Sequence, residues 1–300
     1  MHRISFIIII FINISFLKSQ NITANMVMQG YEEFLNTEYI SSQKIKTIKG
    51  DLHYKRPMKP MYPRDRYFVY HFDEKGRMTK VLDIFKNHEK VFDTLATFYE
   101  YNDFDLLITK RETDNFGFFS TRYLYNDKKQ VVSEVFLREV NALKSKSEFE
   151  LKKDYVVAQE DFKMSYSPDG NVVIRKVMND VGNIYKTIEY MYENNMLVEE
   201  IKRYVLTGAV EKTKFELDES GKLIKKFEEQ GLMEKRMMQS NYIYNENNLL
   251  VEVDIYKNDV QYHHKEFLRN EETKLATAKI DNRKNEEVID VVKYEYQFFD

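Results

Sequence analysis

The sequence predicts an all-β protein, built as a serial antiparallel β-hairpin repeat. Three observations support this. The chain holds 22 Tyr and 21 Phe against 4 Pro and 9 Gly, a composition typical of strands. A short turn-like motif recurs, and its copies keep a nearly constant spacing. Twisted sheets rarely exceed about ten strands without curling, splitting or closing. We therefore expect fourteen to eighteen strands in a meander that forms a large curved, coiled or sandwich-like sheet.

The recurring motif is an apolar residue, usually aromatic, then five mostly polar residues and another apolar residue. An Asp, Asn or Ser at the first polar position favours a type I turn. The fourth position of such a turn with a bulge requires a left-handed conformation, which suits glycine. Lys129 and Met196 are poor residues there, so we expect their two turns to be built differently. The copies begin at Phe72, Tyr101, Tyr125, Tyr166, Tyr192, Leu217 and Tyr244, and the favourable fourth residues are Gly76, Gly170, Gly221 and Asn248.

The residues beside these turns alternate as strand residues do. Residues two apart in a strand face the same side, so the paired tyrosines before four of the turns should share a face. Residues 249–256 and the C-terminal KYEYQFF also alternate. The tyrosine pairs are Tyr99 and Tyr101, Tyr123 and Tyr125, Tyr190 and Tyr192, and Tyr242 and Tyr244.

The spacing of the motif indicates an array of similar units. Successive copies begin 24 to 29 residues apart, except for a step of 41 between Tyr125 and Tyr166. Periods of 20–50 residues are typical of repeated supersecondary units. The long step suggests one more unit, since FELKKDYVV from Phe149 is similar to FELDESGKL from Phe215.

The aromatic-x-aromatic-[Asp/Asn]-x-x-Gly-x-apolar pattern resembles the YD repeats of the RHS family, over roughly residues 68–300. YD repeats carry a firmer Tyr-Asp and Gly than these turns do. The self-cleaving core and toxin tip of RHS proteins have no counterpart here. The resemblance implies a β-hairpin repeat on an exported protein, without catalytic residues.

The N-terminal region divides into two parts. Residues 1–19 combine a basic start, an apolar stretch of about a dozen residues and Ser19 before Gln20, which predicts a cleaved signal peptide. Residues 20–66 are expected to be an N-terminal segment and Pro-rich linker, with a short helix near residues 31–39 and a strand near 44–54. The hairpin-repeat domain then covers residues 67–300. Within it, residues 223–238 fit either a helix or another hairpin.

Composition restricts the cellular location and the partners. The chain has no Cys, which excludes disulfides, thiolate metal sites and a lipid-modified N-terminal Cys. Together with the signal peptide, this favours export to the periplasm or cell surface, or secretion, in a Gram-negative bacterium. The 46 basic and 49 acidic residues nearly balance, so no nucleic-acid partner is expected. No later stretch is long and apolar enough for a transmembrane helix.

Candidate chemical groups are few. Neighbouring strand residues face opposite sides, so His263 and His264 should not chelate one ion, and the sequence identifies no third ligand. The acidic stretches at 102–105 and 281–287 lack the pattern of a calcium loop. No nucleophile elbow, phosphate-binding glycine loop or zinc-protease motif occurs, so we expect no enzymatic activity, metal or cofactor. The densest basic patch comprises Lys55, Arg56, Lys59, Arg64 and Arg66, and is either a solvated loop or a site for an anionic polymer.

The eight paired tyrosines are the candidate binding residues, because a tyrosine ring offers an apolar face and a polar tip. Alternatively they form the hydrophobic core that each strand needs. The expected function is non-enzymatic binding of an envelope protein or polysaccharide on the sheet surface. The alternative is a periplasmic carrier or sensor that encloses an apolar ligand in a curled sheet. The sequence leaves the ligand and the oligomeric state open.

Overall fold

The computed structural model describes residues 37–114, 117–143, 145–231, 236–284 and 286–300. These contain one short helix, α2 (Thr37–Ser42), and eighteen strands. No helix in the described ranges has the length and apolarity needed to cross a membrane. The strands are β1 (Ile45–Lys55), β2 (Met61–Phe72), β3 (Met78–Lys86), β4 (Phe92–Tyr101), β5 (Leu107–Thr113), β6 (Gly117–Tyr125), β7 (Val131–Asn141), β8 (Leu151–Tyr166), β9 (Val172–Met178), β10 (Ile184–Glu193), β11 (Met196–Tyr204), β12 (Val210–Leu217), β13 (Leu223–Gln230), β14 (Arg236–Tyr244), β15 (Leu250–Lys257), β16 (Val260–Arg269), β17 (Ala276–Arg283) and β18 (Ile289–Phe298).

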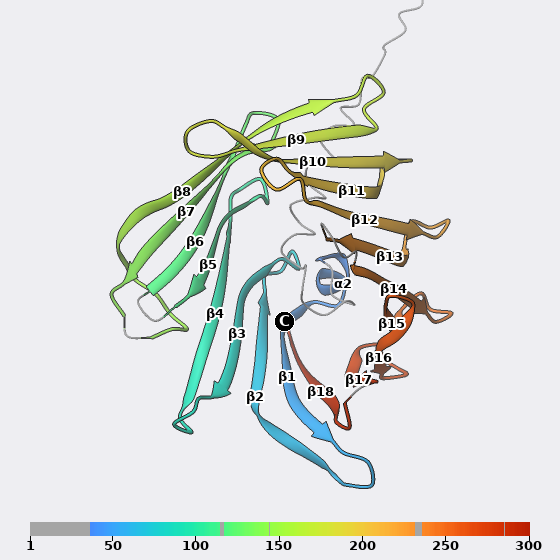
Figure 1. Cartoon of the computed structure of the whole chain (residues 1–300). Coiled ribbons are helices and arrows are strands. Elements are labelled where there is room, and N and C mark those ends of the chain that lie inside the picture. The colour runs from blue at the N-terminus through green and yellow to red at the C-terminus, as the bar shows by residue number, and fades with distance from the viewer. Residues whose placement is uncertain (1–36, 115–116, 144, 232–235, 285) are drawn as a thin grey trace, which may run out of the picture.

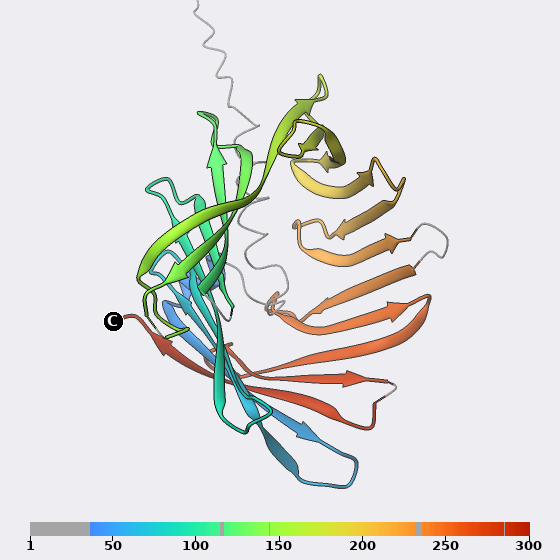
Figure 2. The same cartoon turned by 60° about the vertical axis from the view of Figure 1, so that its left-hand side comes forward.

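The strands form a closed antiparallel barrel, with each strand paired to its neighbours in the chain (Figures 1 and 2). The first and last strands complete the ring. β1 pairs with β18 from Ile45↔Phe298 to Lys55↔Ile289, and on its other edge with β2. The meander predicted from the sequence is therefore present, at the upper end of the expected strand number.

The predicted curved, coiled or sandwich-like sheet is wrong, because β1–β18 pairing closes the sheet into a barrel. The two strands lie more than 200 residues apart in sequence, and no local pattern in either encodes the other as its partner. The pairing also makes edge protection of the terminal strands unnecessary.

Strand alternation sorts the hairpin turns onto two rims of the barrel. The repeat rim holds the turns that follow the even-numbered strands, together with α2, the start of β1 and the end of β18. All seven motif turns lie there. The far rim holds the turns that follow the odd-numbered strands. The repeat-rim turns are residues 73–77, 102–106, 126–130, 167–171, 194–195, 218–222, 245–249 and 270–275.

The predicted turn chemistry is confirmed in detail. Oδ1 of Asn102 accepts hydrogen bonds from the amides of Phe104 and Leu106, both at 3.0 Å. Asp73, Asn126, Asp218 and Asn245 cap their turns in the same way. The expectation for Lys129 was wrong: it adopts the left-handed conformation, φ 58°, as Gly76 does at 77°. The turn before Met196 does differ, with Asn194 and Asn195 both at positive φ.

The main core lies inside the ring, where α2 packs against the inner wall (Figure 1). Ile40 of α2 is fully buried and belongs to one cluster with inner-face residues of β1 to β5 and β15 to β18. The β2–β3 turn fixes the helix position: a Cβ on Gly76 would collide with the carbonyl oxygen of Thr37. Ser41 Oγ also donates to the carbonyl of Glu74, at 3.2 Å.

A smaller cluster lies on the outer face and corrects the expectation of a hidden unit. Phe149, in the loop between β7 and β8, packs edge-on against Phe98 and Phe118, with ring centroids 4.9 and 5.4 Å apart. Beneath it, Arg111 Nε lies 2.7 Å from Glu139 Oε2, and both side chains are buried. The 41-residue step therefore contains one hairpin with a long loop and a long strand, β8, and no extra unit.

The described residues of 45–66 and 223–238, whose structure differs from or was left open by the prediction, mostly form strands. Residues 45–66, which we placed in an N-terminal segment and linker, form β1, its turn and the first half of β2. Residues 223–238 begin the β13–β14 hairpin, which decides against a helix. The predicted signal peptide and most of the predicted short helix lie outside the described residues.

Candidate functional site

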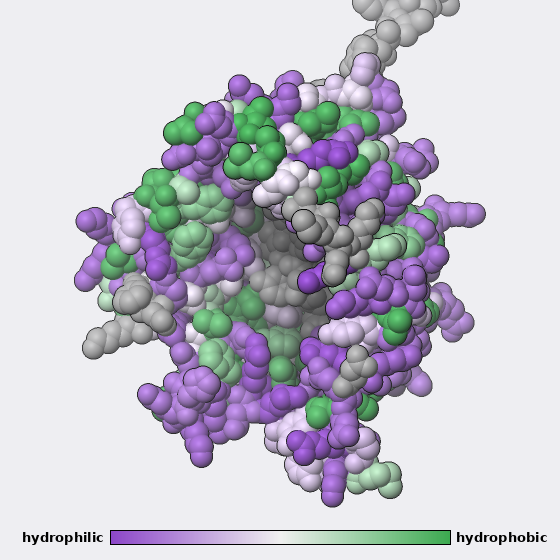
Figure 3. Space-filling model, viewed as in Figure 1, coloured by the Kyte–Doolittle hydropathy of each residue, from purple (hydrophilic) through white to green (hydrophobic). Residues whose placement is uncertain are grey.

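The candidate site is the lumen of the barrel. Eight strands give an interior that side chains fill, whereas barrels of 16–18 strands leave open space. Figure 3 shows the molecule hollowed at the centre of the ring, with hydrophobic and hydrophilic side chains around the hollow. Directly opposed cross-strand residues share a face, so the face that carries the α2 contacts identifies every inner-wall residue.

The eight predicted tyrosines all lie on this inner wall, close to the repeat rim. Tyr99, Tyr101, Tyr123, Tyr242 and Tyr244 belong to the main core with Ile40, or pack against it. Tyr190 and Tyr192 belong to a second cluster, with Phe162 and Val177 on β8 and β9. Tyr99, Tyr190 and Tyr192 are buried, at 4–5% exposure. The tyrosines are thus brought to one layer of the lumen and do not form an exposed ladder.

In three of the four pairs, the second tyrosine also has a repeated structural role. Its hydroxyl donates to the backbone carbonyl of the first residue in the preceding strand, just after the previous repeat-rim turn. Each hydroxyl bond therefore joins the end of one strand to the start of the strand before it. The bonds are Tyr101 to Met78 at 2.9 Å, Tyr125 to Leu107 at 2.6 Å and Tyr244 to Leu223 at 2.9 Å, and Tyr296 makes the same bond to Ala276 at 2.7 Å.

Burial changes the acidity of this layer. Burial raises the pKa of Tyr123 above its ordinary value, and the negative charges of Glu134 and Glu112 raise it further. Burial is also the main reason that the pKa of Tyr125 and of Tyr192 is raised. These phenols stay protonated through the physiological range, and the Tyr125 hydroxyl donates a hydrogen bond to the carbonyl of Leu107.

A charged belt lies deeper in the lumen, on the wall formed by β7 to β13. Along β10, for example, the inner face changes from Tyr192 and Tyr190 through Ile188 to Lys186 with distance from the repeat rim. Neighbouring strands place acidic and basic side chains beside one another at this depth. The charged belt comprises Glu134, Glu160, Arg175, Glu200, Lys202, Glu211, Lys226 and Glu228.

Ion pairs hold the charged belt together. Arg175 lies 2.9 Å from Glu134, and its guanidinium stacks 3.4 Å from the ring centroid of Phe162. The pairs Lys202–Glu200 and Lys226–Glu228 are also 2.9 Å long. The Tyr185 hydroxyl donates to Glu160. The lumen thus combines an apolar, tyrosine-rich layer with a paired polar belt, an arrangement suited to a ligand with an apolar body and a polar end.

Two grooves have mixed linings. One, of about 410 Å³, lies over β12 to β15 and includes Lys212, Phe227 and Met237. The other, of about 750 Å³, lies beside the β10–β11 and β12–β13 turns and includes Glu199, Lys214 and Phe215. Both contain charged and apolar groups, and neither matches the enclosed apolar pocket expected of a carrier.

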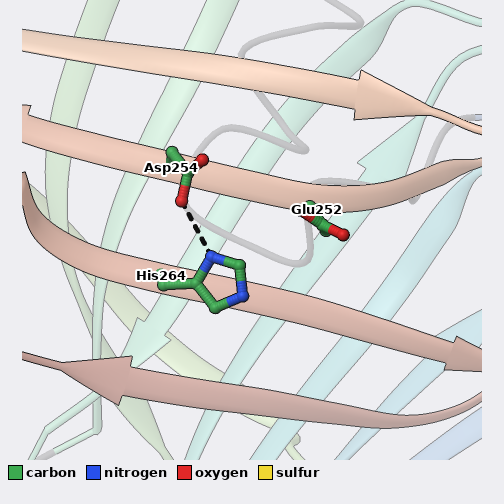
Figure 4. Close-up of side chains that lie close together, drawn as sticks. All are labelled: Glu252, Asp254 and His264. Carbon is green, nitrogen blue, oxygen red and sulfur yellow. Dashed lines mark hydrogen bonds and ion pairs between the residues drawn. The ribbon is translucent and has the colours of Figure 1, made fainter.

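The two adjacent histidines diverge, as predicted from strand geometry. His263 faces the lumen and contacts Asp281 on β17. His264 faces outward, and its Nδ1 donates a hydrogen bond to Oδ1 of Asp254 on β15, 2.8 Å away. Figure 4 shows Glu252 on the same strand as Asp254, near His264. A third ligand for His264 could not be predicted from local spacing, because β15–β16 register brings these residues together.

The other candidate patches are largely neutralised by neighbours. In the basic patch, Arg64 pairs with Asp290, and Arg66 lies 2.6 Å from Asp83. In the acidic stretch at 102–105, Asp105 pairs with Lys75 and with Arg77, at 2.5 and 2.7 Å. These groups stabilise the hairpins and do not converge on a ligand site.

Comparisons with known proteins assign no family. No family model and no curated protein matches the chain. A porin-like protein from Bacteroides uniformis is 12% identical, with 85% of this chain and 97% of that one covered, at a TM-score of 0.40. The TcdB2-TccC3-TEV structure is 10% identical, with 74% of this chain but 13% of that one covered, at a TM-score of 0.29. The Photorhabdus luminescens Tc holotoxin pore is 11% identical, at a TM-score of 0.16. Similarities at this level leave the function to be argued from the site.

Proposed function

We propose that this chain is an exported, non-enzymatic binding protein that carries or senses an amphipathic ligand in its lumen. The β1–β18 pairing carries this proposal, because it turns the tyrosine-rich face inward and encloses it. The apolar layer near the repeat rim would hold the apolar body of the ligand. The charged belt would meet its polar end with groups that are already paired. The alternative expectation from the sequence was a carrier or sensor of an apolar ligand. The charged belt changes the proposed ligand to an amphipathic one, and ring closure favours a lumen over an exposed aromatic sheet surface.

The charged side chains on the outer wall favour a barrel that is surrounded by water. A wall that faces lipid needs an apolar band about 25 Å tall. Here charged side chains occupy mid-strand positions on the outer face, including Lys49 and Asp51 on β1, 2.7 Å apart. Glu199 and Lys212 do so on β11 and β12, at 2.5 Å. Together with the signal peptide predicted over residues 1–19, this favours a protein that acts in the periplasm or outside the cell.

Contact quenching of a single introduced tryptophan tests the lumen proposal, since the chain has no Trp. Thr213 lies on the inner face of β12 between Glu200 and Glu228, whereas Lys214 lies on the outer face. We expect a brominated fatty acid to quench Thr213→Trp saturably and Lys214→Trp only weakly. Equal quenching of both variants, with β-structure retained, would overturn the proposal. The pair Thr121→Trp and Arg122→Trp on β6 repeats the comparison on the opposite wall.

A second function, binding of an extended polypeptide, is favoured by the edge of β8. Residues 151–160 pair with β7, but β9 pairs only with residues 161–166 of β8. Eight consecutive residues, 151–158, are exposed, including Tyr155, Val156 and Val157 at 53%, 60% and 54%. Among the described residues, none pairs with the other edge of residues 151–160. An exposed strand edge of this kind, whose apolar part is residues 155–158, accepts an added strand. We propose that a strand of another envelope protein pairs here.

Site-specific crosslinking in the native envelope tests this second function. A photo-reactive residue at Tyr155 should capture one recurrent protein, and a photo-reactive residue at exposed Phe104 should not. The first part of this edge already carries Lys152, Lys153 and Asp154. Charged residues disfavour edge pairing, so Val156→Lys together with Val157→Lys, which place charge on its apolar part, should abolish the product. Capture of a second copy of this chain, or capture that survives the double substitution, would contradict the proposal.

We also propose that the hairpin unit is of the YD-repeat kind. The support is the combination of the Tyr-x-Tyr-[Asp/Asn] pattern, the capped turn that follows it and the hydroxyl bond from the second tyrosine. The bond gives a physical reason for a tyrosine at that position, because a phenylalanine has no hydroxyl to donate. Comparison of this bond with solved YD-repeat hairpins tests the relationship.

A further inference from the structure

On the outer wall, β15 and β16 place carboxylate and imidazole donor atoms close together. Glu252 and Asp254 are two apart on β15 and so share one face, opposite to Val253, which is buried against the α2 core. His264 is the direct cross-strand partner of Asp254. One donor atom from each of these three residues lies within 4.8 Å of the others, and all three side chains are half-buried (Figure 4).

A second observation points to a cation at this place. Glu266 is the direct cross-strand partner of Glu252, and like charges directly opposite one another destabilise a sheet. Within the described ranges, neither of these two carboxylates has a hydrogen bond or an ion pair to any residue. The facing neighbours on the adjoining strands are uncharged: Ile243 opposite Glu252, and Ile280 opposite Glu266. The described residues therefore leave this pair of negative charges uncompensated.

The chemistry of the donors selects the kind of ion. Calcium prefers oxygen donors alone, whereas one imidazole nitrogen with carboxylate oxygens suits zinc and similar divalent ions. Donors bound to one tetrahedral zinc ion lie about 3.3 Å apart. The His264 Nδ1 to Asp254 Oδ1 separation of 2.8 Å is close to this spacing. Gln261 also donates to Asp254 Oδ1, at 2.7 Å, which is the kind of outer contact that orients a ligating carboxylate.

We propose that Glu252, Asp254 and His264 bind a divalent transition-metal ion, with Glu266 available as a fourth ligand. Three protein ligands and an oxygen-rich fourth position would hold the ion on an exposed face of the wall. The site is separate from the lumen, because the sheet itself lies between them. An ion there would offset the Glu252–Glu266 repulsion and fasten β15 to β16.

Calorimetric titration of the metal-free full chain with Zn²⁺ tests the proposal. We expect one equivalent to bind, and Asp254→Asn and His264→Gln each to weaken binding by more than about tenfold, since loss even of an outer contact has that effect. The exposed His88 provides the matched control, so His88→Gln should bind Zn²⁺ as the unaltered chain does. Absence of stoichiometric binding by the unaltered chain, or equal affinity in all variants, would overturn the proposal.

The unfolding midpoint, measured with and without metal, gives a second test that does not depend on the affinity of one variant. In chelator, Glu266→Gln should raise the unfolding midpoint, because it removes the charge opposite Glu252. Added Zn²⁺ should raise the midpoint of the unaltered chain, and at the same concentration should raise that of Asp254→Asn by less. A midpoint that falls in Glu266→Gln without metal would show that the carboxylate pair is not repulsive, and would contradict the argument for a cation.

Discussion

At the scale of single residues, the second tyrosine of a repeat is explained by one hydroxyl bond. Tyr125 and Tyr244 pack their rings in the inner layer and each donate to a backbone carbonyl near the previous turn. A phenylalanine would keep the ring contact but leave that carbonyl without its donor. The repeated tyrosines are therefore structural first, whatever else they contact in the lumen.

Tyr125→Phe and Tyr244→Phe should each lower the free energy of unfolding by about 1 kcal/mol, the net value of one such hydrogen bond. The two residues lie on β6 and β14, in different repeats, so the double variant should lose about 2 kcal/mol. Denaturant titration measures both. Tyr155→Phe is the control at an exposed tyrosine, and should change stability by less than about 0.5 kcal/mol. Equal losses in all three single variants would contradict the role of the hydroxyl.

Local residue patterns predicted the turns well because each turn is stabilised within itself. The capping oxygen of Asn102 reaches amides only two and four residues ahead, so the sequence contains all the partners. Lys129 shows the limit of this reasoning. Its left-handed φ of 58° costs roughly 1–2 kcal/mol relative to glycine, and the capped turn imposes that conformation on a lysine. The poor preference of lysine for this conformation was outweighed by the hydrogen bonds that Asn126 makes with the amides of Lys128 and Gln130.

At the scale of elements, α2 departs from the repeat, because it is a helix packed inside a ring of strands. It has six residues, and its Ile40 belongs to a core cluster with residues of β1 to β5 and β15 to β18. Its position depends on the β2–β3 turn, where Gly76 allows close contact with the helix backbone. This docking could not be predicted from the sequence, because a six-residue helix has too few turns to show a periodic apolar pattern.

Comparison of Gly76→Ala with Gly170→Ala measures the docking of α2. Both glycines occupy the fourth turn position, with φ of 77° and 71°, so both variants pay about 1–2 kcal/mol for a left-handed alanine. A Cβ at Gly170 meets nothing within 4 Å, whereas a Cβ at Gly76 would also lie 2.7 Å from the amide nitrogen of Ser41. Gly76→Ala should therefore cost at least about 1 kcal/mol more, the scale of a packing clash. Similar losses of unfolding free energy would show that the helix is not seated against this turn.

At the scale of the whole molecule, the buried phenols predict a specific loss of stability in alkali. Burial raises the pKa of Tyr123, Tyr125 and Tyr192 in the folded chain, whereas tyrosines in the unfolded chain ionise near pH 10. Above that pH the unfolded state binds fewer protons, so the free energy of unfolding falls as pH rises. Each such tyrosine contributes a slope of about 1.4 kcal/mol per pH unit.

Denaturant titrations between about pH 9 and pH 11 should therefore show a falling stability, with a shallower slope in Tyr125→Phe. The comparison is of slopes, because this variant also loses a hydrogen bond at every pH. Ultraviolet titration of the phenols gives the control. If all 22 tyrosines ionised together near pH 10 while circular dichroism showed intact β-structure, the inner layer would not be buried.

The sequence predicted the hairpins, their order and the sharing of a face by paired tyrosines, since all of these depend on residues close together in the chain. It did not predict what the sheet does as a whole. Closure depends on Ile45 to Lys55 meeting Ile289 to Phe298, and the charged belt and the His264 cluster depend on register between strands. Cross-strand register is set by the accumulated fit of many contacts, and no single motif in either strand reports it.

Closure of the ring is the central claim, and a thiol crosslink across the β1–β18 seam tests it most directly. The chain has no Cys, so Asp51→Cys with Lys293→Cys, which are direct cross-strand partners on the outer face, introduces one defined pair. His71→Cys with Lys80→Cys, partners within the β2–β3 hairpin, is the control and should crosslink in an open or a closed sheet. We predict that a short bifunctional thiol reagent joins both pairs within monomers, as shown by mass spectrometry of the linked peptides. If the hairpin pair crosslinks and the Asp51–Lys293 pair does not, the sheet is open and the lumen does not exist.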